Sequence, residues 1–170
     1  SFQFLFPSQK IDVIRRVISP NEAEGKALGL SYAASSDINK AAETLSKRKG
    51  DCDDLSLAYM ACIMRLEGEG KIKTEGLRLA VIEHYDPASK EVTGHGNVLH
   101  LSVKNENSKK AEITTFLVDL TYNTATVDLG MDARTSDDAT LKLKFAEHMS
   151  KNRSEQNMIK PELLELRFYD

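Results

Sequence analysis

Residues Asp51 to Leu66 constrain the fold most, because they form a pattern typical of a helix that is apolar over most of its circumference. Apolar side chains recur at helical spacing along one side: Leu55, Tyr59, Cys62 and Leu66. Further apolar side chains cover other sides: Leu57, Met60, Ala61 and Met64. A helix of this kind is usually buried. We therefore expect this segment to be the central helix of the fold, ended by Gly68 and Gly70.

The composition is that of an ordinary globular chain. Its 170 residues suit one domain spanning residues 1–170. Hydrophobic residues make up 41% and charged residues 29%, which argues against intrinsic disorder. The net charge of −3 lacks the basic excess of a nucleic-acid-binding protein, so we expect no nucleic-acid partner.

No segment predicts a membrane span. The longest apolar stretch, Leu55 to Leu66, is short and contains Ser56 and Arg65. No signal-peptide pattern is visible, so the sequence leaves the compartment open between a bacterial cytoplasm and an exported or periplasmic location. If Cys52 and Cys62 share one helix, about 15 Å separates them, which is too far for a disulfide.

The hydrophobic period changes after the helix. Three segments have the composition of strands: Leu77 to Glu83, Val98 to Val103 and Ile113 to Leu120. Polar residues Asn105 to Lys110 predict a turn between the last two. A helix followed by an antiparallel meander indicates an α+β fold.

The flanking regions are less regular. On the N-terminal side we expect a short strand or tucked arm, then helical segments: Ser1 to Ser8, Ile11 to Ile18, Asn21 to Leu30 and Ile38 to Lys47. On the C-terminal side we expect a helix and then a strand or helix: Ala139 to Ser150 and Glu162 to Tyr169. The sequence assigns no role to residues 128–170.

The sequence Gly-Asp-Cys-Asp-Asp at residues 50–54 places a thiol at the start of the buried helix. Asp51 is a good N-cap, which puts Cys52 at the first helical position. A helix N-terminus favours a thiolate and offers backbone N–H groups to an oxyanion. Asp53 and Asp54 oppose thiolate formation, so a cationic partner is needed. We predict that Cys52 is a nucleophile, and that Cys62 is a core residue.

Strand pairing helps to choose that partner among the four histidines. If His100 lies opposite Asp119 in an antiparallel pair, one face of the pair becomes wholly apolar: Leu99, Leu101 and Val103 face Leu120, Val118 and Phe116. If His95 lies opposite Asp119, the apolar residues are split between the faces. Because a half-buried sheet prefers the first register, we favour His100 as the base and keep His95 as the alternative.

In four blocks the sequence resembles the core of the transglutaminase-like cysteine enzymes of the papain-like superfamily: GDCDDLSLAYMACIMR, LRLAVIE, VLHLSV and FLVDLTY. Within that superfamily it is most similar to the bacterial transglutaminase-like cysteine proteinases. The blocks lie within residues 49–123, under half of the chain. This sequence differs from the family pattern by an insertion around Pro87 to Gly96, by the lack of a Trp after the histidine, and by Leu120-Thr121 in place of Pro-Thr.

The resemblance implies a papain-like α+β fold, with the cysteine helix packed on an antiparallel sheet, and a catalytic triad. Cys52 matches the nucleophile, His100 the base, and Asp119 the residue that orients the base. Asp51 and Asp53 match positions that bind calcium in the bacterial proteinases. From the residues alone, Asp51 and Asp53 are more simply explained as N-cap and first-turn charges, so we expect no required cofactor, with calcium as a candidate ligand.

Together these features predict a cysteine hydrolase that acts on an amide bond of a protein or peptide through a thioester. Water would give proteolysis or glutamine deamidation, and an amine would give transamidation. Two alternatives stay open. One is a peptidoglycan-type amidase of the same superfamily, and the other is a protein-binding domain that kept the fold without the chemistry.

Overall fold

The computed structural model describes residues 1–34, 40–104, 112–122 and 125–170. Its α-helices are α1 (Pro7–Ile18), α2 (Ala23–Ala27), α3 (Ala41–Lys47), α4 (Cys52–Gly68) and α5 (Asp138–Met149). Its strands are β1 (Ser31–Tyr32), β2 (Lys49–Gly50), β3 (Gly76–Asp86), β4 (Glu91–Val103), β5 (Ile113–Asp119), β6 (Ala125–Asp128) and β7 (Leu164–Tyr169). Short 3-10 helices span Phe2–Phe4, Glu155–Asn157 and Pro161–Leu163.

The main sheet has five strands in the order β6-β5-β4-β3-β7, and every neighbouring pair is antiparallel. Strands β1 and β2 form a separate two-residue parallel pair beside α3. The predicted α+β class and the meander from β3 to β5 are therefore confirmed.

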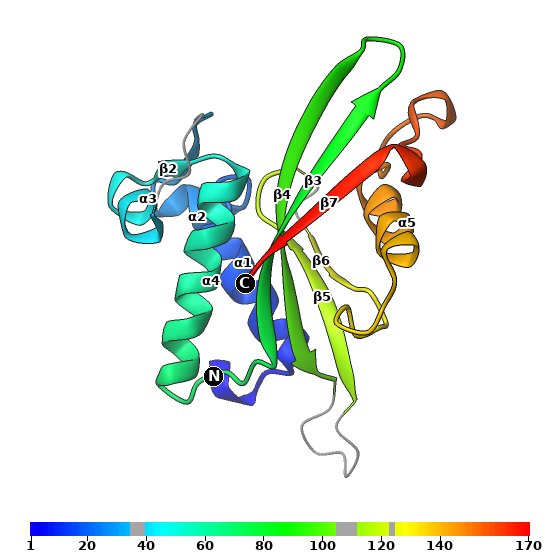
Figure 1. Ribbon diagram of the computed structural model, residues 1–170. Helices are drawn as coiled ribbons and strands as arrows, with labels where there is room; N and C mark the ends of the chain where they lie inside the picture. The colour runs from blue at the N-terminus through cyan, green and yellow to red at the C-terminus, as the bar shows by residue number, and fades with distance from the viewer. Residues whose placement is uncertain (35–39, 105–111, 123–124) are drawn as a thin grey trace.

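Helices cover both faces of this sheet (Figure 1). α1 and α4 lie on one face and α5 lies on the other. Successive residues of β4 point to opposite sides, so Val98 joins the core beneath α4 whereas Leu99 joins the core beneath α5. Both side chains are almost fully buried, which means that the sheet has no water-facing side in its centre.

α4 has the expected place against the sheet and the expected cap. Asp51 accepts a hydrogen bond from the backbone N–H of Asp54, and Asp54 accepts one from the N–H of Asp51, both at 3.2 Å. Leu55 and Tyr59 are completely buried, but Met64 is 63% exposed. The apolar pattern of α4 predicts burial around most of the helix. In the structure the helix is buried on the side that faces the sheet, and Met64 on another side is exposed.

The β3–β4 hairpin is longer than the sequence predicts. β4 begins at Glu91, well before the predicted start at Val98, and β3 continues to Asp86. Pro87, Gly94 and Gly96 give the connecting sequence the composition of a loop, yet most of it is paired strand. The hairpin projects beyond the rest of the sheet in Figure 1.

Most of the flanking predictions hold. The helix predicted over Ile11 to Ile18 is α1, and the one predicted over Ala139 to Ser150 is α5. The first residues form a 3-10 helix and not a strand, and Glu162 to Tyr169 supplies the end of a 3-10 helix followed by β7. The predicted turn at Asn105 to Lys110 lies outside the described residues, as does the start of the helix predicted from Ile38.

None of the helices described, across residues 1–34, 40–104, 112–122 and 125–170, is both long enough and apolar enough to cross a membrane.

The packing of α5 against the sheet makes Phe145 a sensitive test of the second core. Phe145 is fully buried, whereas Leu143 on the same helix is 48% exposed. We expect Phe145→Ala to lower the free energy of unfolding by about 3–5 kcal/mol, because it leaves a cavity under α5. Leu143→Ala should change it by less than about 0.5 kcal/mol. Denaturant unfolding measures both, and equal losses would mean that α5 does not pack as described.

Candidate active site

The first turn of α4 lies directly against β4. The backbone N–H of Gly96 donates to Sγ of Cys52 at 3.3 Å. A side chain on Gly96 would collide with Oδ1 of Asp53 as it is placed, so a glycine at position 96 lets the helix start and the strand approach closely without moving that carboxylate. The contact places Cys52 beside the residue that precedes Gly96, which is His95.

The imidazole of His95 connects the cysteine to a buried carboxylate. Its Nε2 donates to Oδ2 of Asp119 at 2.8 Å. Burial alone would lower the pKa of His95, but hydrogen bonds with Asp119 and Cys52 outweigh burial and raise that pKa to about 10. The ring is therefore held as an imidazolium between Cys52 and a carboxylate.

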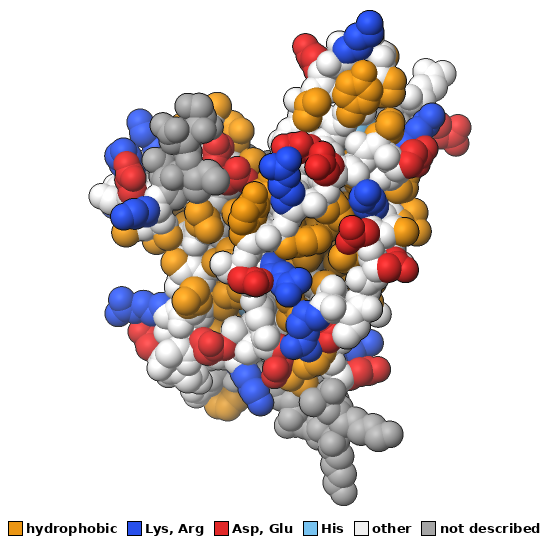
Figure 2. All heavy atoms as spheres, in the orientation of Figure 1, with side chains coloured by type: hydrophobic (Ala, Val, Ile, Leu, Met, Phe, Trp, Pro, Cys, Tyr) orange, Lys and Arg blue, Asp and Glu red, His pale blue; other side chains and the backbone are white. Residues whose placement is uncertain are grey.

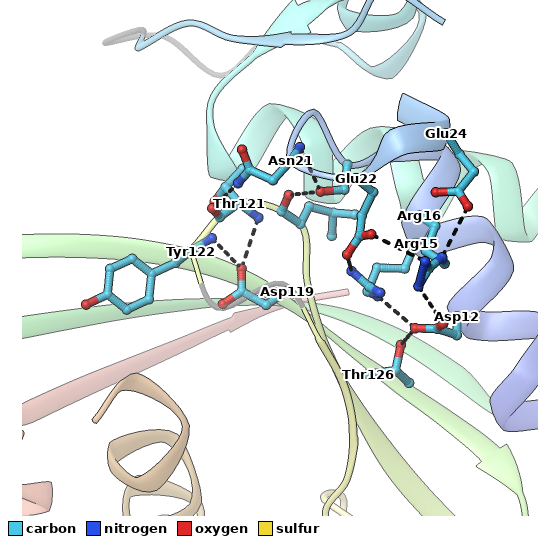
Figure 3. A network of polar contacts seen from close by, with 12 residues as sticks. Asp12, Arg15, Arg16, Asn21, Glu22, Glu24, Asp119, Thr121, Tyr122 and Thr126 are labelled. Atoms are coloured by element: carbon cyan, nitrogen blue, oxygen red, sulfur yellow. Dashed lines mark hydrogen bonds and ion pairs between the residues drawn. The ribbon is translucent and has the colours of Figure 1, made fainter. Parts of the chain in front are cut away.

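Asp119 stands where β5 ends, and both of its carboxylate oxygens are engaged. Oδ1 accepts from the backbone N–H groups of Thr121 and Tyr122, each at 3.1 Å (Figure 3). Oδ2 accepts from His95 and, at 2.7 Å, from Nε2 of His148 on α5. Burial would raise the pKa of Asp119, but these two histidines hold it far below its ordinary value. Asp119 therefore caps the turn at Thr121 and also contacts two histidines.

His148 was not among the residues that the sequence analysis selected for the site. It is almost completely buried and lies on the same side of α5 as Leu141 and Phe145. That spacing along a helix predicts burial for His148, but a buried histidine alone does not identify its partner. Only the packing of α5 on the sheet shows that the partner is Asp119.

The structure does not bring His100 to this site. His100 is fully buried between α4 and the sheet, where its Nδ1 is hydrogen-bonded to the hydroxyl of Tyr59 at 2.8 Å. Burial lowers the pKa of His100 to about 3, so the ring is neutral. In the ladder His100 pairs with Phe116 and not with Asp119, so the predicted register is wrong.

The register prediction failed for a physical reason. It assumed that one face of the β4–β5 pair is buried and the other is wet. Helices cover both faces, so both registers bury apolar side chains and alternation does not choose between them. The second register, with His95 opposite Asp119, is not observed either: Val98 pairs with Val118, and the ladder ends there. His95 reaches Asp119 from beyond the last paired residues.

A pocket of about 350 Å³ opens onto the cysteine and the imidazole. Its lining comes from five parts of the chain: Asn21, Tyr32, Cys52, Gly94, His95, Thr121 and Tyr122. Tyr32 and Tyr122 are about half exposed and line it with aromatic surface. Cys52 and His95 are thus accessible to a ligand, whereas Asp119 is completely buried.

One wall of the pocket is the turn that follows β5, and residues between α1 and α2 hold this turn by hydrogen bonds. The side chain of Asn21 donates to the carbonyl of Thr121 at 2.6 Å, and Ser19 donates to the carbonyl of Leu120 at 2.8 Å (Figure 3). The buried guanidinium of Arg15 in turn pairs with Glu22 at 3.0 Å, which holds this connection in place. The turn that caps Asp119 is therefore supported from outside the sheet.

The acidic residues beside Cys52 do not form a calcium site by themselves. Asp51, Cys52 and Asp53 offer ligand atoms within 4.8 Å of one another. Asp51 already caps the helix. Burial, followed by the charges of Asp51 and Asp54, raises the pKa of Asp53, which disfavours its charged form. Calcium takes six to eight oxygen ligands, and this group offers two carboxylates and a sulfur. These residues by themselves do not fit the ion.

Both cysteines are free, as their predicted separation on one helix requires. Cys62 lies in the middle of α4, where burial raises the pKa of its thiol. It therefore serves as an internal reference for the reactivity of Cys52.

The chain matches no protein-family model, and comparison with characterised proteins finds no significant sequence similarity.

The geometry of the site predicts which histidine activates Cys52. At pH 6 an ordinary thiol is less than about 1% thiolate, and a neighbouring imidazolium increases that fraction. We expect Cys52 to react with iodoacetamide at pH 6 at least about tenfold faster than Cys62. His95→Ala should remove that advantage at pH 6 and preserve reaction at pH 9.5, where thiols ionise without help. Peptide mass spectrometry reports both rates.

The matched control is the double variant His100→Phe/Tyr59→Phe, which removes both partners of the buried hydrogen bond at once. Its reactivity at pH 6 should stay within about twofold of the unmodified protein. A loss in this variant, with His95→Ala unaffected, would restore His100 as the partner of Cys52.

A second prediction concerns the bond between His148 and Asp119. In a double-mutant cycle of His148→Gln and Asp119→Asn, denaturant unfolding should give a coupling energy of about 1–3 kcal/mol, because each variant alone disrupts a buried charge-assisted bond. His84→Gln is the matched control, since His84 lies on β3, where it pairs with Thr93 and Leu164. Its coupling with Asp119→Asn should be near zero. Equal couplings would contradict the contact.

Proposed function

We propose that this chain is a thiol-dependent hydrolase with a papain-like, transglutaminase-like core, and that it acts on an amide bond of a protein or peptide. One observation carries the proposal: the imidazole of His95 lies between the thiol of Cys52 and the buried carboxylate of Asp119. A nucleophile, a base and a residue that orients the base form the usual arrangement for acyl transfer. The base in this proposal is His95, in place of His100.

The proposed chemistry follows from which atoms are already engaged. Nε2 of His95 is bonded to Asp119, which leaves Nδ1 to hold the proton given up by the thiol, so the reacting pair is a Cys52 thiolate and a His95 imidazolium. The Cys52 thiolate then attacks the amide carbonyl carbon and forms a tetrahedral intermediate. When the C–N bond breaks, His95 returns its proton to the departing amine and a thioester remains. Water, deprotonated by His95, releases the acid and restores the thiol.

The start of α4 supports the charge that develops in this reaction. Cys52 occupies the first helical position, so its backbone N–H has no partner within the helix. That N–H and the positive end of the helix dipole favour the oxyanion. Asp119 keeps the imidazole in one orientation and balances the imidazolium. It can do so because its other oxygen is fixed by Thr121 and Tyr122.

The arrangement of α4 on an antiparallel sheet fits the papain-like architecture that the sequence blocks resemble. The same resemblance favours hydrolysis over transamidation. The thiol of Cys52 is partly buried and opens onto a pocket lined by aromatic and polar side chains, which suits a nucleophile that meets a peptide better than it suits a purely structural cysteine.

The test is turnover of an unfolded protein by matched cysteine variants. Labelled casein reports peptide-bond cleavage, and ammonia release from its glutamines reports deamidation. We expect Cys52→Ala to lower either rate at least about a thousandfold, because the thioester cannot form, whereas Cys62→Ala keeps more than half of it. Full activity in Cys52→Ala would refute the proposal. Cleavage of cell-wall peptides but not of casein would favour the amidase alternative.

A further inference from the structure

β4 extends beyond its neighbour on one side only. It pairs with β3 along Glu91–Leu101, but with β5 only from Val98 onward. Residues 91–97 therefore have a strand partner on the β3 side and no strand partner on the other side, among the residues that the structure describes. This unpaired edge begins at the active site, because Gly96 lies on it.

Two hydrogen bonds show which backbone groups point outward from this edge. The N–H of Gly96 points away from β3, toward Cys52. The carbonyl of Leu101 accepts from Glu75, just before β3, so it points the opposite way. Since backbone direction alternates along a strand, the N–H and C=O groups of Gly94 and Val92 point outward with those of Gly96. Among the described residues, no hydrogen bond is made to the outward N–H and C=O groups of Val92 or of Gly94.

Gly94 carries no side chain, and the space on the face of the strand where one would stand is open. A side chain built on it would meet nothing within 4 Å, in contrast to one on Gly96. Glycine inside a strand often marks a place where a second backbone approaches closely. Gly94 also lines the pocket that contains Cys52 and His95, so the edge and the pocket are continuous. The outward groups of Gly94 and Gly96 are about 7 Å apart, which matches the two-residue repeat of an extended peptide.

Apolar side chains flank the same edge. Tyr85 and Val92 are paired across the hairpin, and they are 43% and 61% exposed. Figure 2 shows hydrophobic side chains on the projecting end of the molecule formed by this hairpin. An exposed pair of this kind gives a bound strand an apolar neighbour for alternate side chains.

We propose that an extended segment of a polypeptide substrate binds here by strand addition, pairing with the outward groups of Val92 and Gly94 and so delivering an amide to Cys52. This inference rests on the proposed function and names its substrate class: unfolded or extended protein segments. A second copy of this chain is a poorer occupant, because two outward residues bury far less area than a stable dimer needs. Backbone hydrogen bonds give affinity for a peptide of any sequence, and the flanking side chains give a preference among peptide sequences.

The experiment compares peptides that carry a thiol-reactive group with small reagents that carry the same group but no peptide. Pools of pentapeptides randomised at every position carry either an N-terminal chloroacetyl group or a C-terminal chloromethyl ketone, which places the peptide on either side of the reacting carbon. Chloroacetamide and N-acetylalanine chloromethyl ketone are the peptide-free counterparts. The ratio of the two alkylation rates at Cys52 measures peptide binding independently of the intrinsic reactivity of the thiol.

We expect at least one pool to react at least tenfold faster than its counterpart. The same pool with N-methylated backbone amides should lose most of that gain, because it cannot donate to the strand edge. Val92→Pro removes an outward N–H that β3 does not use, so it should lower the ratio at least fivefold, whereas Val92→Ala keeps the N–H and should retain at least half. Each variant is normalised to its own rate with the peptide-free reagent.

Rate ratios near one for both pools would overturn the strand-addition inference. Rate ratios that neither N-methylation of the peptide nor Val92→Pro lowers would overturn it as well. Those results combined with fast chloroacetamide reaction at pH 6 would leave the proposed hydrolase standing. A peptide gain with an ordinary thiol would support the binding edge and reject the hydrolase. Hydrogen exchange supplies the last check: protection of Val92 and Gly94 that rises with protein concentration alone, without peptide, would assign the edge to a second copy and overturn the inference.

Discussion

The buried carboxylate of Asp119 is the interaction on which the rest of this structure depends. A completely buried charge is stable only when hydrogen bonds and an opposite charge surround it. Here the donors come from the turn after β5, from His95 on β4 and from His148 on α5. Because one side chain joins three parts of the chain, the position of the candidate base depends on the packing of the C-terminal helix as well as on the strand that carries it.

The second constraint is the close contact between the start of α4 and β4. The capped helix presents Cys52, and Gly96 allows the strand to come near enough for its N–H to reach the sulfur. The hydrophobic cores on both sides of the sheet hold these elements in place. A short polar contact between helix and strand is thus fixed by a large apolar one, which is the usual way for a protein to position reactive groups on rigid elements.

The long β3–β4 hairpin links the fold to the proposed function. Relative to the pattern of the bacterial proteinases, part of this hairpin is an insertion in the sequence. In the structure most of that insertion is regular strand with one open edge. That edge, the pocket and the thiol lie along one continuous surface. If peptides bind there, the residues that distinguish this chain from the family pattern are those that hold its substrate, while the cysteine, histidine and aspartate carry out the chemistry.

The local features of the fold follow from the sequence alone. Helical spacing and the Asp51 cap predict α4 with Cys52 at its first position, and β-rich runs locate the centres of β3, β4 and β5. Which histidine meets Asp119 depends instead on tertiary packing. Alternation fixes register when one face of a sheet is wet, but helices cover both faces here, so His95 and His100 could not be separated by pattern. The contact with His148 likewise joins residues that are 29 positions apart, and its geometry arises from packing that no local pattern encodes.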